Sequence, residues 1–268
     1  MPMKDSSVAQ AQRLRLGGNT DTDWLKLIAL IFMMIDHLGV ALYGNIPEMR
    51  MLGRIAMPVY AWCLIVGCVY TRDMKRYALR LFVMALVSQP INMIALGNPW
   101  GKLNILFLFT IAVLVIYAVQ QRKYFSHLWA PVAAFLLLGF INVDYGWKGL
   151  AFLLLLYMAR NGRAGLAALM LAYAAFWGAS YSPINSIAGV SLTFLSWPGI
   201  GVVLQPFFRT QALMVLALPF ILVRTHSGIK LPKWVGYGFY PLHLLVIIVL
   251  RVLHGDSLAS LLAVLGQV

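Results

Sequence analysis

The stretch Trp24–Tyr43, which reads WLKLIALIFMMIDHLGVALY, decides the fold class. A helix of this length, at about 1.5 Å of rise per residue, crosses the hydrocarbon core of a bilayer. The stretch also carries Asp36 and His37 in its second half and Lys26 near its start. A charged side chain costs roughly 2.5–3.5 kcal/mol at the centre of a membrane helix. These three side chains therefore require a protein-lined or wet surrounding.

Similar stretches recur along the whole chain of 268 residues, of which 62% are hydrophobic and 11% are charged. This composition excludes a soluble globular domain and predicts one all-α, polytopic transmembrane helical bundle. We predict about nine spans, within a range of eight to ten, at residues 24–43, 51–70, 77–96, 103–120, 127–142, 146–159, 164–181, 211–224 and 235–253.

The remaining segments complete the predicted domain organisation. Residues 1–23 form a cytoplasmic tail, residues 24–253 form a single transmembrane domain, and residues 254–268 form a C-terminal tail. Within the domain, prolines and glycines interrupt the apolar segment 182–210. Because these residues break helices, we expect an extracytoplasmic or re-entrant segment there.

The formal net charge of +13 would suggest nucleic acid as the partner of a soluble protein. In a membrane protein, an unequal distribution of Lys and Arg between the loops explains it better. With nine spans and a cytoplasmic N-terminus, thirteen basic residues fall in inner segments and five in outer segments. The distribution predicts this orientation, with membrane lipid and not nucleic acid as the surrounding partner.

In this orientation, polar residues from distant segments fall in the outer half of the bundle. They are Asp36 and His37 in the first span, Arg54 at the start of the second, Asn104 at the start of the fourth, Asp144 in the turn before the sixth, and Tyr240 and His243 in the last. Lys26 lies eleven residues before His37, so the two share one helix face about 16 Å apart. Arg72 belongs to an inner basic cluster.

The pair Asp36-His37 has two interpretations. His37 can act as a general base, with Asp36 tuning or orienting the site, or both can simply bond to neighbouring helices. Adjacent helical residues point about 100° apart, so Asp36 is expected to meet a neighbour of its own. Arg54 is either that counter-ion or, with Asn104, a stabiliser of an oxyanion. His243 and Tyr240 form a second acid–base pair or an interhelical bond, while Asn104 and Asp144 also fit as a helix cap and a turn residue.

No metal site is expected. Cys63 and Cys68 are five residues apart, which matches neither a metal-binding nor a redox motif. The sequence contains no HExxH motif and no nucleophile-elbow serine. Metallohydrolase and serine-hydrolase chemistry therefore have no support in the sequence.

Several stretches together resemble the TraX family of conjugative pilus acetylation proteins. They are LKLIALIFMMIDHLG at 25–39, MLGRIAMPVYAWCLIVGCVYTRDMKRYALRLFVMALVSQ at 51–89, LNILFLFTIAVL at 103–114, VDYGWKGLAFLLLLY at 143–157, QALMVLALPFILV at 211–223 and FYPLHLL at 239–245. The Asp36-His37 pair and the Gly-Arg-x-x-x-Pro motif that begins at Gly53 are the most specific parts. The resemblance covers roughly residues 24–253 with 182–210 left aside.

The resemblance implies an integral membrane acyltransferase of the bacterial cytoplasmic membrane. Acetyl-CoA would be the donor, and the N-terminus of a pilin subunit or another extracytoplasmic amine or hydroxyl would be the acceptor. It implicates Asp36, His37, Arg54, Arg72, Asn104, Asp144, Tyr240 and His243, with His37 as a base or as an acyl carrier. Two alternatives stay open: a transporter or flippase with Asp36-His37 as a proton relay, and a non-catalytic scaffold for pilus assembly.

Overall fold

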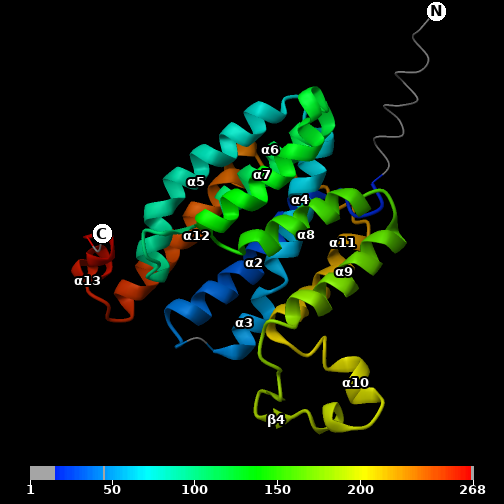
Figure 1. The fold of residues 1–268 in the computed structure, drawn as a ribbon. Helices are drawn as coiled ribbons and strands as arrows, with labels where there is room; N and C mark the ends of the chain where they lie inside the picture. The colour runs from blue at the N-terminus through cyan, green and yellow to red at the C-terminus, as the bar shows by residue number, and fades with distance from the viewer. Residues whose placement is uncertain (1–15, 45, 267–268) are drawn as a thin grey trace, which may run out of the picture.

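The computed structural model describes residues 16–44 and 46–266, which fold into a bundle of helices (Figure 1). The main helices are α2 (Thr22–Ala41), α4 (Ala56–Tyr70), α5 (Met74–Leu96), α6 (Ile105–Gln121), α7 (Ser126–Phe140), α8 (Gly146–Ala159), α9 (Arg163–Gly178) and α12 (Lys233–Leu253). The predicted helical bundle is confirmed. Lys4, Arg13 and Arg15, which support the predicted orientation, lie outside the described residues.

Short elements connect these helices. They are the helices α3 (Pro47–Gly53), α10 (Ile200–Leu204), α11 (Leu218–Leu222) and α13 (Leu258–Leu262), the 3-10 segments η1 (Lys123–Phe125), η2 (Thr193–Ser196), η3 (Thr210–Ala217) and η4 (Ala263–Gly266), and the strands β1 (Lys102–Leu103), β2 (Asn142–Val143), β3 (Ser186–Ile187) and β4 (Val190–Ser191). Strands β1 and β2 pair in parallel, which joins the loop before α6 to the loop before α8.

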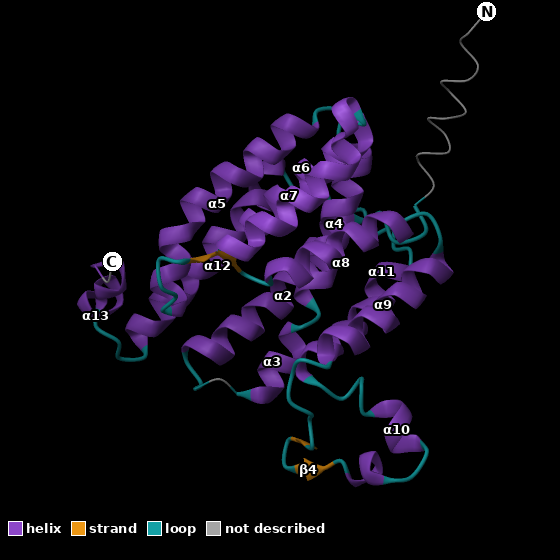
Figure 2. Cartoon of the chain, viewed as in Figure 1, coloured by secondary structure: helices purple, strands orange, loops and turns teal. Residues whose placement is uncertain are grey.

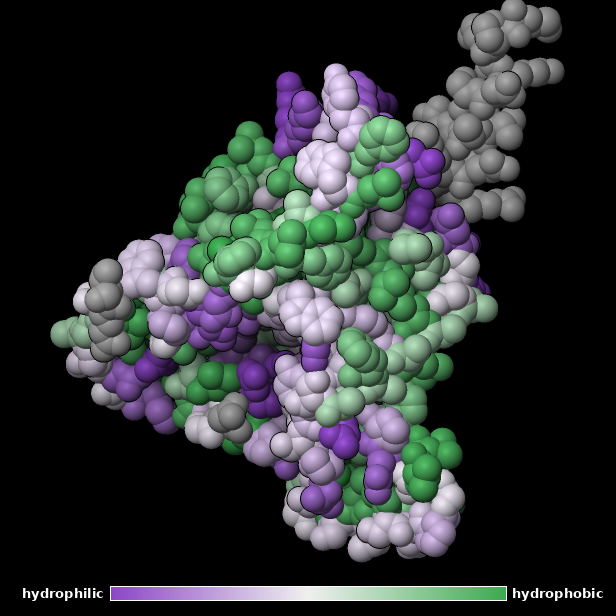
Figure 3. All heavy atoms as spheres, viewed as in Figure 1, coloured by the Kyte–Doolittle hydropathy of each residue, from purple (hydrophilic) through white to green (hydrophobic). Residues whose placement is uncertain are grey.

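Among the described residues, three helical segments are long and apolar enough to cross a membrane: α2, Pro47–Tyr70, and α5. Five shorter apolar helices accompany them. Hydrophobic residues cover the middle of the visible face over α5 to α8, and hydrophilic residues gather toward both ends (Figure 3). The protein therefore has membrane character, whereas the count of nine spans and the orientation stay predictions.

Two predicted spans are not single regular α-helices. The predicted span 51–70 consists of the end of α3 and the whole of α4, with a break at Arg54 and Ile55. The predicted span 211–224 consists of η3 followed by the five residues of α11. Pro219, near the start of α11, has no backbone N–H to donate to the preceding turn, which disfavours a continuous α-helix there.

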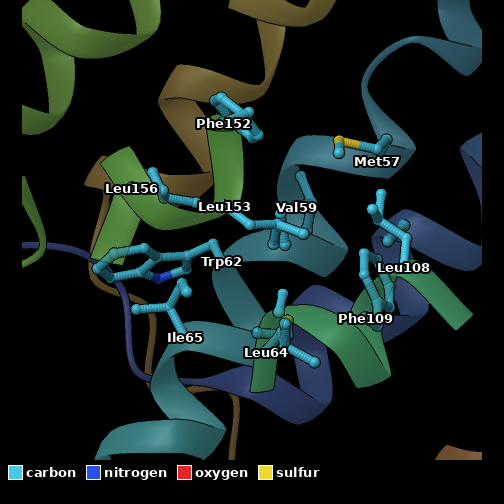
Figure 4. Packing of buried hydrophobic residues seen from close by; sticks show 14 of the residues in the cluster. Met57, Val59, Trp62, Leu64, Ile65, Leu108, Phe109, Phe152, Leu153 and Leu156 are labelled. Carbon is cyan, nitrogen blue, oxygen red and sulfur yellow. The ribbon is translucent and has the colours of Figure 1, made fainter. Parts of the chain in front are cut away.

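Helix α4 lies at the centre of the bundle and is buried on nearly all sides. Its Trp62 lies beside Leu153 and Leu156 of α8, Ile65 lies on the other side of the Trp62 ring, and Leu64 lies toward Phe109 of α6 (Figure 4). Because buried apolar side chains pack at the density of organic crystals, this core fixes the positions of the surrounding helices. Those helices in turn hold the polar groups described below.

Residues 182–210 form a lobe that projects from one end of the bundle (Figures 1 and 2). The lobe contains the β3–β4 hairpin, η2 and α10. Its hairpin is fastened to the bundle where the backbone N–H of Ala188 donates to Glu48 in α3, at 3.0 Å. The lobe is thus attached to the short helix that leads to Arg54.

The described part of the predicted N-terminal tail is packed into the bundle. The backbone carbonyl of Asn19 accepts a hydrogen bond of 2.6 Å from the indole of Trp62, and the Asn19 side chain donates to Thr225 at 3.0 Å. A Cβ on Gly18 would lie 2.5 Å from the Trp62 ring, so only glycine fits there. The segment that precedes α2 is therefore part of the folded domain.

Candidate functional site

Asp36 lies in a buried cluster of charged groups. Its carboxylate accepts one hydrogen bond from Arg54 at 2.8 Å and another from Arg50 at 3.0 Å. Arg54 also donates to Gln211 at 3.1 Å and to the backbone carbonyl of Arg50 at 3.2 Å. Asp36 and Arg54 are only 7% and 6% exposed. Each nitrogen of the Arg54 guanidinium has a partner, so the group acts as the counter-ion of Asp36.

The position of Gly53 explains how this cluster fits together. A Cβ at this position would fall on the side chain of Asp36. Glycine therefore lets the end of α3 approach α2 closely, and Arg54 follows at once in the chain. This gives a physical reason for the glycine in the Gly-Arg-x-x-x-Pro motif.

His37 belongs to a different group of residues, as its orientation on α2 predicts. Its Nδ1 lies 2.9 Å from Nε2 of His243 on α12, and the two rings stack with centroids 5.0 Å apart. Among the described residues, no carboxylate bonds to either ring. The partner of His37 is thus a second imidazole, 206 residues away in the sequence, and Asp36 has partners of its own, as expected from helix geometry.

The hydrogen bonds of the pair determine where its protons lie. His243 Nδ1 is 3.0 Å from the carbonyl oxygen of Phe239, which can only accept, so this nitrogen carries the proton. In a neutral pair, His243 Nε2 then has a lone pair and accepts from His37 Nδ1. The other nitrogen of His37, Nε2, is left with a free lone pair and has no hydrogen-bond partner among the described residues. This is the form that a general base requires.

A cavity with a volume of about 140 Å³ lies beside the histidine pair and extends along α2. It is lined at one end by Asp36 and His37, where α2 finishes, and at the other by Lys26, where α2 begins. We call these the His37 end and the Lys26 end of the bundle. Between them the wall is mostly apolar, from residues such as Met33, Met57, Leu81, Phe109 and Phe239. The predicted shared face of Lys26 and His37 is confirmed.

Tyr240 also lines this cavity, with its ring 5.3 Å from that of His243. A chain of hydrogen bonds leads to its hydroxyl: Lys102 Nζ bonds to Asn98 Oδ1 at 3.2 Å, Asn98 Nδ2 to Asn92 Oδ1 at 3.0 Å, and Asn92 Nδ2 to the Tyr240 hydroxyl at 3.3 Å. A lysine ammonium can only donate, which sets the direction of every bond in the chain. Tyr240 is therefore an acceptor from Asn92, and its own proton is free to point into the cavity.

The other predicted site residues form no hydrogen bond with the pair among the described residues. The Asn104 side chain donates to Gln89 and to the backbone carbonyl of Ala85, each at 2.9 Å, and caps α6 at Leu106. Asp144 lines the cavity at the His37 end, with its carboxylate 3.7 Å from Lys102. Lys26 forms an ion pair with Asp23 at 3.0 Å. Arg72 lies exposed in the turn between α4 and α5, beyond the Lys26 end of the cavity.

Four residues of the two groups were not singled out from the sequence as site residues: Arg50, Asn98, Lys102 and Gln211. Arg50 precedes Arg54 by one helical turn, which is a usable signal for a shared partner. Gln211 is a polar residue at the start of an apolar run, which is a weaker one. Asn98 and Lys102 lie in the loop after α5, and only the folded structure brings them to Asn92.

The part of the chain that contains the site residues, from α2 to α12, matches a known protein family. Residues 21–251 match the family described as TraX protein. The chain belongs to the TraX family. It is 31% identical to Protein TraX of Escherichia coli strain K12 over 208 residues, which cover 72% of this chain and 81% of that protein. It is 30% identical to another Escherichia coli Protein TraX over 186 residues, which cover 65% and 72%.

A third relative, an uncharacterized protein of Rickettsia prowazekii, is 30% identical over 149 residues. That alignment spans 54% of this chain and 58% of the Rickettsia protein, which is less than two thirds of its length. No solved structure matches the chain. The predicted membership in the TraX family is confirmed by the family match and by the two TraX relatives.

Proposed function

We propose that this TraX-family protein is a multi-pass acyltransferase of the bacterial cytoplasmic membrane. It would transfer an acetyl group from acetyl-CoA to an extracytoplasmic amine or hydroxyl, such as the N-terminus of a pilin subunit. The observation that carries the proposal is the His37–His243 pair, whose free lone pair belongs to a residue that lines a cavity reaching Lys26.

The cavity suits the donor in two respects. Its apolar wall suits the acetyl thioester end of an acyl-CoA, for which a volume of about 140 Å³ has room, since cofactor sites are mostly apolar with a few polar groups. Beyond its Lys26 end, the exposed side chains of Arg72, Lys75 and Arg76 offer positive charge to the donor's phosphates. The donor supplies an acetyl group activated as a thioester.

His37 performs the proton transfer in this mechanism. Its Nε2 takes the proton of the acceptor amine or hydroxyl as the acceptor's lone pair forms a bond to the thioester carbon. The bond from that carbon to sulfur then breaks, and the proton passes from His37 to the leaving thiolate. His243 holds His37 in the required tautomer through its own bond to Phe239.

Tyr240 stabilises the negative charge that develops on the oxygen of the reacting carbonyl. Its hydroxyl lines the same cavity, and the bonds from Lys102 through Asn98 and Asn92 leave the phenolic proton available. A hydrogen-bond donor that is already in place at such a position lowers the activation barrier by about 2.7–4 kcal/mol. Arg54 and Asn104 already have partners, so we assign the role to Tyr240.

The test is an acetylation assay with the purified protein in lipid nanodiscs, acetyl-CoA as donor, and a peptide with a free N-terminal alanine as acceptor. We expect the peptide to gain the mass of one acetyl group, and His37→Gln to slow this gain roughly 10²- to 10⁴-fold. His226→Gln, which changes an exposed histidine in the loop before α12, is the matched control and keeps full activity.

Full activity in His37→Gln would exclude His37 as the base or acyl carrier. Proton-coupled uptake of a solute by proteoliposomes, with no acetylated product, would instead support a transporter. Normal pilus assembly with both His37 and His243 replaced would support a scaffold.

A further inference from the structure

A second, more open hollow lies at the His37 end of the bundle. It has a volume of about 470 Å³ and is lined by Lys102, Asn142, Val143, Asp144, Tyr145, Gly146, Trp147, Lys148, Trp177, Ser180 and Tyr181. We call it the outer groove. Asp144 and Tyr145 line both the outer groove and the cavity that contains His37. One turn of the chain therefore separates the two spaces.

The shared turn is rigid on the side of the outer groove. The ring of Tyr145 meets the buried ring of Trp177 edge to face, with centroids 5.7 Å apart. The parallel pairing of β1 with β2 holds the backbone of Val143 beside that of Leu103. A molecule bound in the outer groove would thus lie against a fixed wall whose other side faces His37.

The charge in the outer groove is predominantly positive. Lys148 donates to the hydroxyl of Ser180 at 2.5 Å and lies 5.5 Å from the ring of Trp147, and no carboxylate pairs with it among the described residues. Lys102 is 37% exposed and only partly neutralised by Asp144 at 3.7 Å. The groove also contains the start of α8, where the first turn has no side-chain cap, which adds to the positive potential.

We propose that the outer groove is the acceptor-binding site and that Lys102 and Lys148 bind an anionic group, a carboxylate or a phosphate, on the acceptor. This inference rests on the acyltransferase function proposed above and assigns a substrate class to it. The acceptor's anionic group lies between the two lysines, and its amine or hydroxyl lies at the Asp144–Tyr145 turn, which also lines the cavity that contains His37. Asp144 lies 3.7 Å from Lys102, so Lys148, which pairs with no carboxylate among the described residues, is the stronger of the two contacts for the anion.

Binding is measured first, with inorganic phosphate as the probe and without any acyl donor. The protein is held in phosphatidylcholine nanodiscs, and the fluorescence of its tryptophans is followed, since Trp147 and Trp177 line the groove. We expect saturable phosphate binding, weakened about tenfold in Lys148→Gln, because the variant loses one charge-assisted hydrogen bond to the phosphate. Lys123→Gln, which removes an exposed lysine from η1 at a distance from the groove, leaves the binding unchanged.

The source of the anion is distinguished by the lipid. If the natural ligand is a lipid headgroup, nanodiscs of phosphatidylglycerol will compete with phosphate and raise its apparent Kd. If it belongs to a water-soluble acceptor, the Kd will be the same in both lipids. Each of these results supports an anion site. Equal Kd values in the wild type, Lys148→Gln and Lys102→Gln, or no binding at all, would overturn it.

Turnover is measured next, with glucosamine 6-phosphate and glucosamine as paired acceptors. We expect a KM at least tenfold lower for the phosphorylated acceptor, and loss of this preference in Lys148→Gln with little change in kcat. Equal KM values in the wild type would contradict an acceptor role for the groove. If no acetyl transfer occurs with any acceptor while phosphate binds at the two lysines, the acyltransferase proposal fails and the anion site remains.

Discussion

Asp36 and His37 are neighbours in the chain, yet they belong to two different polar groups. Asp36 turns toward α3, and its carboxylate forms ion pairs with Arg50 and Arg54. His37 turns toward α12 and pairs with His243. Among the described residues, no carboxylate is bonded to either ring. One group is ionic and gives each guanidinium nitrogen of Arg54 a partner, whereas the other consists of two imidazoles and leaves Nε2 of His37 without one among the described residues.

This difference indicates a structural role for the Asp36 group and a chemical role for the histidine pair. A buried ion pair whose guanidinium nitrogens all have partners within the protein holds helices together, which is a structural role. An imidazole with one nitrogen fixed and the other open can exchange a proton with a substrate. The geometry of consecutive residues on a helix, about 100° apart, lets one turn of α2 serve both purposes.

The largest expected effect is the loss of folding stability in Arg54→Ala. The change would leave Asp36 buried with only the partly exposed Arg50 as partner, and breaking such a pair costs about 3–5 kcal/mol. We expect a large fall in the thermal unfolding midpoint of the purified protein in detergent, or failure to accumulate in the membrane. The measurement is unfolding followed by circular dichroism.

Arg50→Ala is the matched control for this prediction. Its side chain is 31% exposed, so its ion pair with Asp36 is worth about 1 kcal/mol or less. A loss of stability in Arg50→Ala as large as that in Arg54→Ala would show that burial does not distinguish the two arginines. The comparison between the ionic group and the histidine pair would then need a different explanation.

His243→Gln is expected to act on activity and not on stability. Without His243, His37 loses the partner that holds its proton on Nδ1, so we expect acetyl transfer to fall about 10²-fold while the unfolding midpoint changes little. The measurements are the acetylation rate and the midpoint on the same preparation. If the variant has a lower unfolding midpoint but retains its acetylation rate, the role of the histidine pair is structural.

A smaller effect is expected from Asn98→Ala, which interrupts the bonds between Lys102 and Asn92. The Tyr240 hydroxyl then loses its fixed direction, and we expect kcat to fall about tenfold with KM unchanged. Asn98→Asp makes a matched variant, because it accepts from Lys102 but cannot donate to Asn92. If Asn98→Asp retains the full rate while Asn98→Ala does not, the direction of the chain is unimportant.

The smallest effect concerns Asp21, the carboxylate just before α2. Burial opposes its ionisation, but hydrogen bonds from Ser227 and Thr225 outweigh this and lower its pKa below the ordinary value of 3.8. Its contribution to stability is therefore complete above about pH 4 to 5 and is lost as the pH falls through the lower pKa of the folded state. The unfolding midpoint of Asp21→Asn should accordingly depend less on pH below 4 than that of the wild type. Parallel pH profiles would contradict this.

Much of the fold follows from the sequence because apolar length is a strong signal. The helices α2, α5, α6 and α12 lie close to the predicted spans. The break at Arg54 and the 3-10 geometry of η3 were not predicted, since both arise from local backbone geometry within apolar runs. Hydrophobicity alone does not reveal them.

The sequence predicted several residues of the candidate site but did not predict which of them pair with one another. His37 and His243 were both selected as ionisable residues in apolar helices, but they are 206 residues apart, and nothing in the sequence joins them. The separation of Asp36 from His37 did follow from helix geometry. The chain from Lys102 to Tyr240 did not, because it depends on how the loop after α5 packs against α12.

The burial of the N-terminal segment has a consequence for biosynthesis. Asn19 and Asp21 precede the first helix, yet they bond to Thr225 and Ser227, which the ribosome adds more than 200 residues later. The first membrane helix must therefore be inserted and kept in place before its own start is anchored. These hydrogen bonds form only after synthesis of the loop before α12. A chain truncated before that loop therefore lacks them, and its site is incomplete.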